Sequence, residues 1–372
     1  MPESIISPGL ILYILAWLIG TLLLWRIENL NRTAAPADLK KMRRISIIIP
    51  ARNEETRLGA LLNSLEQQKD CDIETILVDD HSTDNTSRLA LQKGLRVIPS
   101  QTLPEGWSGK NWVCWQGAQA AQGDVLLFLD ADTWLLPGGV ARLLSAWQQT
   151  GGLLTVQPDH LTQKAYEQLS AFFNLVLMAS INAFTVLGKR LAPGGGFGPC
   201  VMCSRADYFA AGGHSNVRNV ILESIPLVRN FIRMGLPVRC LIGRGAIAFR
   251  MYPGGYQQLL EGWSKGFGKG AVMVNPIFTI LASIWITGCF GAFSQTVRLL
   301  ITGQIWILAV YAAYALQIAW MLYRIGRWQV WTVILFPIPL TFFALVMLRS
   351  LVLNYIIRRV SWHGRSIPTQ EK

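Results

Sequence analysis

The chain has 372 residues, of which 51% are hydrophobic and only 15% are charged, and its mean hydropathy is +0.33. This composition is too apolar for an ordinary soluble protein. The net charge of +12 raises the question of nucleic-acid binding, but the sequence holds no basic recognition helix or binding motif, so we expect no nucleic-acid partner. Much of the positive charge flanks apolar segments, which favours attraction to anionic lipid.

The first apolar segment, residues 8–25, carries no charge and is long enough to cross a hydrocarbon core of about 30 Å. Residues 1–7 contain no Lys or Arg, whereas six such residues follow within 26–44. This distribution disfavours a cleaved signal peptide. Under the positive-inside rule, it predicts an N-terminal transmembrane helix over residues 1–26 and places the next domain, residues 27–270, in the cytoplasm.

The domain over residues 27–270 alternates buried apolar runs with amphipathic helices. Leucines 58, 61, 62 and 65, for example, lie on one helical face. This alternation predicts an α/β fold, with a mostly parallel sheet and helices on both faces. The predicted strands are 45–49, 75–78, 95–98 and 125–129, and the predicted helices follow them, beginning near residues 55, 82, 109 and 138.

Polar clusters follow three of these strands, and the carboxyl ends of parallel strands are where such sheets bind ligands. Two carboxylates at the end of a buried strand need a partner, and a divalent cation that also binds phosphate is a suitable one. The sequence lacks G-x-G-x-x-G and G-x-x-x-x-G-K-[ST], which disfavours a dinucleotide oxidoreductase and a P-loop enzyme. The clusters are Arg52, Asn53 and Glu54; Asp79 and Asp80; and Asp130 and Asp132.

Three further apolar segments follow the domain, at residues 271–297, 299–323 and 329–348. We therefore predict C-terminal transmembrane helices and a short basic tail over residues 271–372. The last segment contains Pro337 and Pro339, and prolines this close break a helix. Another complete crossing would place the basic tail outside, against the positive-inside rule. We predict a broken or re-entrant element over residues 329–357 that returns the tail to the cytoplasm.

Three motifs resemble those of glycosyltransferase family 2 in order and spacing: P-A-R-N-E at 50–54, V-D-D-H-S-T-D at 78–84 and L-D-A-D at 129–132. The resemblance implies a GT-A fold, a nucleotide-sugar donor and inversion of the anomeric centre. Residues 106–112, G-W-S-G-K-N-W, are similar to the membrane-bound branch of this family that acts on isoprenoid lipids. That branch includes carotenoid-acid and hopanoid-associated transferases.

The same resemblance implies a donor site for a UDP-sugar. Asp132, with Asp130 nearer the ribose, would hold Mg²⁺ or Mn²⁺ against the diphosphate, where the metal stabilises the leaving UDP. Lys110 either adds positive charge near these phosphates or is a solvated loop lysine. Asp79 or Asp80 would contact the uracil. The rest of the implied nucleotide pocket is Pro50, Ala51, Arg52, Asn53 and Glu54.

Family members usually carry Glu-Asp as the catalytic base, whereas this chain has Glu223 followed by Ser224. The resemblance implies that Glu223 is the general base. An acceptor hydroxyl must lose its proton as it attacks, so a positioned base helps. A carboxylic acid is already ionised at pH 7, and with such an acceptor Glu223 would only position it. The sequence leaves both roles open.

The acceptor side is implied by motifs further along the chain. His214 lies in a G-G-H motif, and Glu261, Trp263 and Lys265 stand where family members carry Q-x-x-R-W. The Arg of that motif is absent here, and Lys265 is a candidate to replace its charge. Residues 169–187 are almost wholly apolar and form either an interfacial helix that receives a lipid or a helix buried under the sheet.

We therefore expect an inner-membrane enzyme that moves a hexose from a UDP-sugar to a membrane isoprenoid acceptor, and the resemblance implies that this hexose is glucose. The acceptor group implied by the resemblance is the carboxylate of a carotenoid acid. Two alternatives stay open at this point. One is transfer to another lipid, such as a hopanoid or diacylglycerol. The other is a non-catalytic membrane scaffold or transporter that carries a degenerate sugar-nucleotide domain.

Overall fold

The computed structural model of the protein describes residues 8–30, 44–273, 275–302, 306–353, 359–362 and 365–368. The chain forms two compact units. Unit 1 comprises Met1–Ile27, Thr162–Leu191 and Met251–Lys372, and unit 2 comprises Glu28–Leu161 and Ala192–Arg250. Residues 162–191 thus group with the two ends of the chain. The three-part division at residues 26 and 270 stays a prediction.

Unit 2 is built on a seven-stranded sheet in the order β3-β2-β1-β4-β8-β6-β9. Neighbouring strands are parallel except that β8 runs antiparallel to both β4 and β6, so the sheet is mixed rather than uniformly parallel. The strands are β1 (Ile45–Ala51), β2 (Ile73–Asp79), β3 (Arg96–Pro99), β4 (Val125–Leu129), β6 (Leu153–Gln157), β8 (Cys200–Ser204) and β9 (Val238–Ile242). Three short strands, β5 (Thr133–Leu135), β7 (Asp159–Leu161) and β10 (Ile247–Phe249), also pair with one another.

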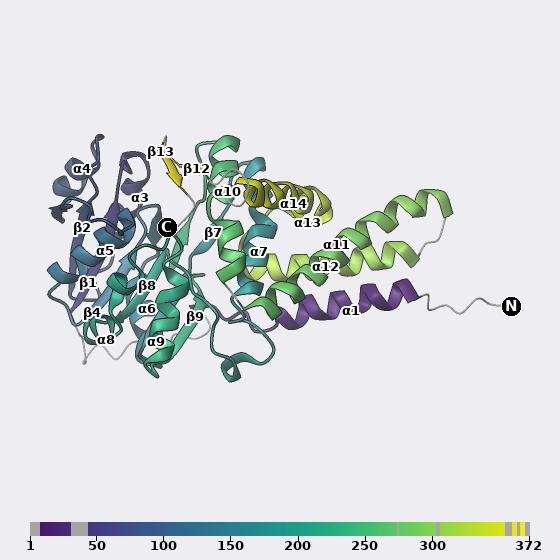
Figure 1. Ribbon diagram of the computed structural model, residues 1–372, viewed down its shortest axis with the longest axis horizontal. Helices are drawn as coiled ribbons and strands as arrows, with labels where there is room; N and C mark the ends of the chain where they lie inside the picture. Colours follow the sequence, from purple (N-terminus) through teal and green to yellow (C-terminus); the bar gives the residue numbers. More distant parts are fainter. Residues whose placement is uncertain are drawn as a thin grey trace. The chain divides into compact units, whose positions relative to one another are not determined.

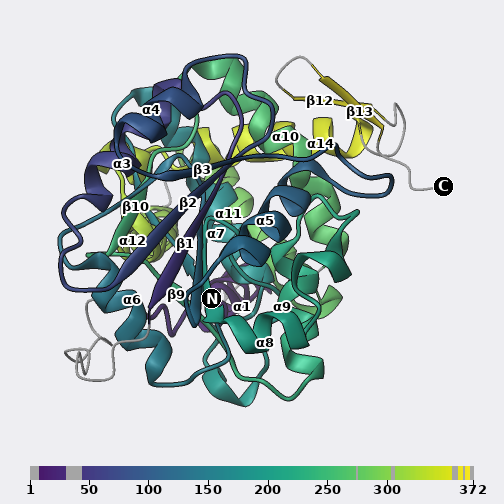
Figure 2. The ribbon, with the colours of Figure 1, turned by 90° about the vertical axis from the view of Figure 1, so that its left-hand side faces the viewer.

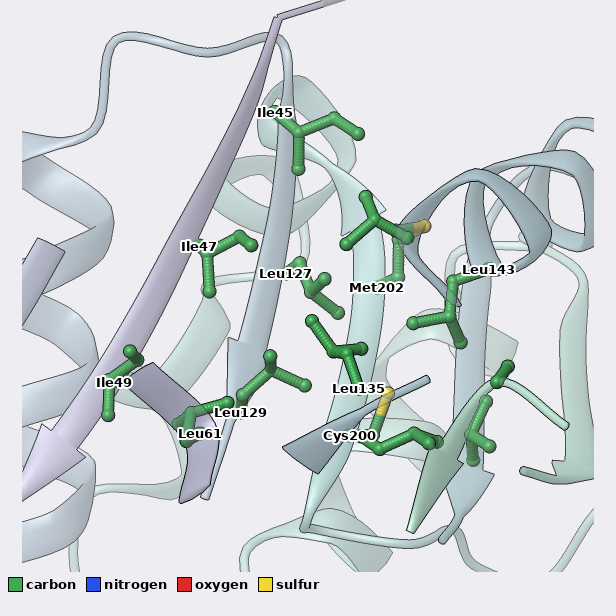
Figure 3. Close-up of a cluster of buried hydrophobic side chains, with 14 of the residues drawn as sticks. Ile45, Ile47, Ile49, Leu61, Leu127, Leu129, Leu135, Leu143, Cys200 and Met202 are labelled. Carbon is green, nitrogen blue, oxygen red and sulfur yellow. The ribbon is translucent and has the colours of Figure 1, made fainter. Parts of the chain in front are cut away.

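Helices cover both faces of this sheet, as predicted (Figure 2). Successive residues of β1 point to opposite faces, so Ile47 packs on the side of α3 and α6 while Ile48 packs on the side of α5. Figure 3 shows the apolar core on the side of α3 and α6, with Ile47, Leu127 and Met202 from three strands. The helices of unit 2 are α3 (Glu55–Leu65), α4 (Thr86–Gln92), α5 (Gly109–Ala120), α6 (Gly139–Gln148), α8 (Arg205–Ala210) and α9 (Ser224–Arg233), with a 3-10 turn η4 (Gly213–Val217).

Helix α5 packs closely against β1 and β2 at Gly117, a residue without a side chain. A Cβ atom added to Gly117 would lie 2.4 Å from Cγ2 of Ile48 and 3.2 Å from Cγ2 of Val78. Any larger residue would therefore push α5 away from β1 and β2. Since α5 also carries Lys110 in its first turn, Gly117 fixes the height of that lysine above the sheet.

Unit 1 consists mainly of apolar helices, and Figure 1 shows α1, α11 and α12 side by side. A buried glutamine joins these three helices: Gln317 Nε2 donates to the Trp17 carbonyl at 2.6 Å, and Trp285 Nε1 donates to Gln317 Oε1 at 2.9 Å. The helices are α1 (Pro8–Leu23), α7 (Ala171–Ser180), α10 (Tyr256–Met273), α11 (Pro276–Thr302), α12 (Trp306–Ile325), α13 (Val330–Ile334) and α14 (Pro337–Leu351). Shorter elements are η2 (Ala165–Ser170), η3 (Gly188–Arg190), β11 (Gly326–Arg327) and an antiparallel hairpin of β12 (Arg359–Trp362) and β13 (Arg365–Pro368).

Two helices of the described chain are long and apolar enough to cross a membrane, over Pro276–Thr296 and Ile307–Ile325. The helices at Gly9–Leu23 and Pro337–Leu351 are apolar but shorter, so spans at these positions stay a prediction. The predicted break in the last segment is confirmed, because α13 ends at Ile334 and Pro337 opens α14. A return of the tail to the cytoplasm stays a prediction.

The apolar stretch over residues 169–187 contains a single short helix, α7, and most of its side chains are buried. Phe173 stacks on Trp263 with 4.5 Å between ring centroids, and Phe172 stacks on Trp285 at 6.2 Å. The helix is therefore buried within unit 1, and its reception of a lipid stays a prediction. The apolar helices of unit 1 cover α7.

Replacing Gly117 by Ala should lower the thermal unfolding midpoint of the detergent-solubilised protein. Overpacking against Ile48 costs about 1 to 3 kcal/mol, and the better helix propensity of Ala, about 1 kcal/mol, offsets only part of it. Gly59 in α3 is the matched control, because a Cβ there would meet no atom within 4 Å. Gly59→Ala should leave the midpoint unchanged or raise it, and equal losses in both variants would contradict the close approach of α5.

Candidate active site

The loops that follow β1 and β2 are hydrogen-bonded to each other at the carboxyl edge of the sheet. The Asp80 N–H donates to the Ala51 carbonyl at 2.8 Å, and the Thr83 N–H donates to Asn53 Oδ1 at 2.8 Å. Asn53 and His81 adopt positive φ angles of 54° and 55°, which both residue types tolerate better than most. The first two polar clusters therefore meet at one edge, as the strand order predicted.

Charged side chains reinforce this contact. Arg52 Nη1 lies 3.1 Å from Asp80 Oδ2, and Asp79 Oδ1 accepts a hydrogen bond from the Ser82 N–H at 3.2 Å. Glu54 continues the loop into α3, and its N–H donates to Thr86 Oγ1 at 2.8 Å. The result is a continuous polar rim around the ends of β1 and β2.

Asp130 and Asp132 extend this rim beyond β4, with side chains that are 27% and 31% exposed. The Asp130 N–H donates to the Pro199 carbonyl at 3.0 Å, which fixes the turn after the strand. Burial, together with the neighbouring Asp130 carboxylate, raises the pKa of Asp132 to about 6. Burial also raises the pKa of Asp130, although Lys110 opposes that rise. Burial is thus the main cause of the raised pKa of each carboxylate.

Arg57 is a member of this rim that no sequence motif singled out. Its Nε lies 3.1 Å from Glu54 Oε2, and its Nη1 lies 3.9 Å from Asp132 Oδ2. Burial raises the pKa of Glu54 to about 7 even with Arg57 beside it. The only sequence signal for Arg57 is its spacing of three residues after Glu54, about one turn of helix.

Lys110 is the second residue of α5, and its ammonium joins two carboxylates from distant parts of the chain. Nζ lies 2.7 Å from Asp130 Oδ1 and 3.0 Å from Glu223 Oε1. Burial alone would lower the pKa of Lys110, but the two carboxylates outweigh burial and hold that pKa well above its ordinary value. The alternative of a solvated loop lysine is therefore wrong.

Glu223 stands immediately before α9, and it is 7% exposed. Burial opposes its ionisation, yet Lys110 and other donors lower the pKa of the Glu223 carboxyl below its ordinary value. Gly198 allows this placement, because a Cβ there would lie 3.0 Å from Glu223 Oε1. The carboxylate faces a pocket lined by Pro50, Lys110, Cys114, Phe128, Asp130, Gly198, Val201, His214, Glu223, Ser224 and Leu227.

His214 lies in the same pocket as Glu223, as part of η4. Its Nδ1 lies 2.7 Å from the hydroxyl of Tyr208, and its ring packs 5.1 Å from the ring of Phe128. Asn111 of the G-W-S-G-K-N-W motif supports the segment after His214, since its buried Nδ2 donates to the Val217 carbonyl at 2.7 Å. Tyr208 and Asn111 were not predicted as part of the site.

The remaining predicted residues belong to α10 of unit 1. Trp263 is buried, and its Nε1 donates to Ser170 Oγ at 3.0 Å. Glu261 is exposed. The side chain of Lys265 lies outside the part of the chain that the structure describes, so its proposed replacement of the missing Arg stays a prediction.

A divalent cation fits Asp130 and Asp132 as part of a complex with a ligand. Within the described ranges, no group of three His, Cys, Asp or Glu residues is placed to hold a metal by itself. Mg²⁺ and similar ions often use one or two carboxylates and take their other ligands from phosphate oxygens and water. The raised pKa values of both carboxylates show that added positive charge would be stabilising here.

Comparisons with known proteins agree with this geometry. Residues 46–174 match the sequence model of glycosyl transferase family 2. The 4,4'-diaponeurosporenoate glycosyltransferase of Staphylococcus aureus (strain USA300) is 34% identical over 328 residues, covering 86% of this chain and 87% of that protein. The chain belongs to glycosyltransferase family 2. It is therefore an enzyme, and the alternative of a non-catalytic scaffold or transporter is disfavoured.

A second relative and one solved structure also resemble this glycosyltransferase over much of its length. The enzyme of the same name from Staphylococcus haemolyticus (strain JCSC1435) is 38% identical over 255 residues, covering 67% of this chain and 68% of that one. A mannosyltransferase of Pyrobaculum calidifontis, solved with GDP-Man and Mn²⁺, superposes with a TM-score of 0.56 at 15% identity. It covers 94% of this chain and 96% of its own, which confirms the GT-A-like fold.

Proposed function

We propose that this glycosyltransferase moves a hexose, expected to be glucose, from a UDP-sugar to the carboxylate of a membrane isoprenoid, a carotenoid acid. The observation that carries the proposal is the contact of Lys110 with both Asp130 and Glu223. One cation thereby links a carboxylate expected on the donor side to one expected on the acceptor side. The names of the two staphylococcal relatives support a carotenoid acid as the acceptor.

On the donor side, the hydrogen-bonded loops after β1 and β2 would hold the nucleoside, with Asp79 or Asp80 at the uracil. Asp130 and Asp132 would hold Mg²⁺ or Mn²⁺ against the diphosphate. That ion, when bound, supplies charge stabilisation of the leaving UDP. Arg57 keeps Asp132 at the rim, and Lys110 keeps Asp130 turned toward the pocket.

On the acceptor side, Glu223 is the group that faces the incoming oxygen. A carboxylate acceptor attacks the anomeric carbon directly, the bond from that carbon to the diphosphate oxygen breaks, and UDP leaves with the electron pair. No proton moves in this step, because the acceptor is already ionised at pH 7. Glu223 then orients the acceptor, and Lys110 limits repulsion between the two negative groups.

A second candidate is transfer to a lipid hydroxyl, as in a hopanoid or diacylglycerol. The ionised state of Glu223 favours this candidate, since a hydroxyl acceptor needs a base to take its proton, although the lowered pKa makes Glu223 a weaker base. In that case Glu223 receives the proton as the new bond forms. The two candidates differ in the product, which is an ester in the first case and a glycoside in the second.

We further propose that the catalytic domain, residues 27–270, lies on the cytoplasmic face of the cell membrane. Support comes from the two candidate spans in α11 and α12 and from the Lys and Arg residues that follow the first apolar segment. A lipid acceptor dissolved in the bilayer would then reach the enzyme at the surface where the UDP-sugar is available.

The product distinguishes the two acceptors. Membranes containing the protein, supplied with UDP-[¹⁴C]glucose and a panel of lipids, should form a labelled product from a polyene carboxylic acid. That product should release glucose in mild base, because a glycosyl ester is hydrolysed there and a glycoside is not. A base-stable product formed from a lipid alcohol would contradict the carboxylate acceptor and support the second candidate.

Replacing Asp132 by Ala should abolish Mn²⁺-dependent UDP binding and lower kcat/KM by about a hundredfold or more, since a bound metal supplies several kcal/mol. Asp124 is the matched control, because it is exposed and precedes β4 at the end opposite Asp130 and Asp132. Asp124→Ala should bind UDP as the wild type does, measured by calorimetry with and without Mn²⁺. Unchanged turnover in Asp132→Ala would contradict the proposed donor site.

A further inference from the structure

The hydroxyl of Tyr208 makes two hydrogen bonds, both to His214. The backbone N–H of His214 donates to the Tyr208 oxygen at 3.1 Å. The same oxygen lies 2.7 Å from His214 Nδ1. A hydroxyl oxygen can accept two hydrogen bonds, but among the described residues no other group accepts from this buried hydroxyl, so its one hydrogen is donated to Nδ1.

The imidazole of His214 is therefore protonated on Nε2. The side chain is 3% exposed, and burial lowers its pKa to about 4, so the ring is neutral at physiological pH. A neutral ring with an acceptor at Nδ1 presents a single N–H donor at Nε2. Tyr208 is thus a positioning residue, which selects one tautomer and fixes the ring plane.

No described residue accepts a hydrogen bond from Nε2 of His214. Its hydrogen bonds are the two with Tyr208, its ring packs against Phe128 and Tyr208, and the charges of Glu223 and Lys110 also act on it. A donor that faces a ligand pocket without a protein acceptor can pair with a bound molecule or with water. Since His214 lines the pocket that also contains Lys110 and Glu223, the missing acceptor is expected from a molecule bound there.

We propose that His214 donates a hydrogen bond from Nε2 to the carboxylate of the acceptor, at the oxygen that does not attack. This proposal rests on the proposed function and deepens it, because it identifies a residue that selects a carboxylate, with its two oxygens, over a hydroxyl. The attacking oxygen forms the bond to the anomeric carbon while the second oxygen stays on His214. UDP leaves with the electron pair, and no proton is transferred.

The chemistry of the pocket favours a carboxylate over a hydroxyl at this position. A donor directed at an attacking hydroxyl oxygen would withdraw electron density from the nucleophile. A carboxylate avoids this conflict, since its second oxygen accepts the hydrogen bond and the first remains free. Lys110 is positive and contacts Glu223, so it reduces the repulsion that the acceptor would meet from that residue.

Three variants test this role. His214→Leu removes the donor and should raise the KM for the carotenoid acid about 10- to 100-fold, the loss expected for one hydrogen bond to a charged group. His214→Gln keeps an N–H at a similar distance from the backbone and should stay within about threefold of the wild-type KM. The third variant, Tyr208→Phe, should leave the Nδ1 site without its hydrogen-bond donor. In all three, the Kd for UDP with Mn²⁺ should be unchanged, which also shows that the site is folded.

The tautomer can be measured independently of turnover. The chain has four histidines, so the ring nitrogens of ¹⁵N-histidine-labelled protein can be assigned with His214→Gln. The wild type should show a protonated Nε2 and an unprotonated Nδ1 at His214, and Tyr208→Phe should reduce that preference. This measurement decides the tautomer even if His214→Leu does not fold.

Two results would overturn the role of His214. One is an unchanged acceptor KM in folded His214→Leu, and the other is a KM in His214→Gln as high as in His214→Leu. A proton on Nδ1 of the wild type would contradict the positioning by Tyr208. The wild-type product separates failure of the proposed function from failure of this role of His214. A base-stable glycoside formed from a lipid alcohol would contradict the carboxylate acceptor, whatever the variants show.

Discussion

The contact of Lys110 with Asp130 and Glu223 is the interaction on which the site depends. Two carboxylates held near each other in a mostly buried pocket repel, and removing both from water is costly without a counterion. Lys110 supplies that counterion from the first turn of α5, and the close approach of α5 to β1 at Gly117 holds it in place. The packing of one helix on the sheet thus controls the electrostatics of the pocket.

Much of this arrangement is predictable from the sequence because it is local. Two apolar runs, one before Pro50 and one before Asp130, predicted β1 and β4. The polar residues that follow these parallel strands lie at one edge of the sheet, as parallel pairing requires. The apolar periodicity at Leu58, Leu61 and Leu62 gave α3. The motif around Lys110 also indicated its importance, although not its partners.

The remaining features depend on contacts between distant parts of the chain. Lys110 and Glu223 are more than a hundred residues apart in the sequence, so no spacing rule predicts their 3.0 Å contact. Strand β8 is short and follows a Gly- and Pro-rich stretch, and its antiparallel insertion beside β4 has no local signal. For α7, composition indicated an apolar environment, but composition alone does not reveal which apolar surface covers a helix.

The most direct test of this account is the turnover number of Lys110→Met at saturating donor and acceptor. The carboxylate partners of this lysine are largely buried, but Lys110 itself is 36% exposed, so solvent reduces the loss to about 1.4 kcal/mol or more, and kcat should fall about tenfold or more. Lys93→Met is the control, since Lys93 pairs with the exposed Glu66 on the surface and should change kcat little. A kcat for Lys110→Met within about twofold of the wild type would contradict the central role of this lysine.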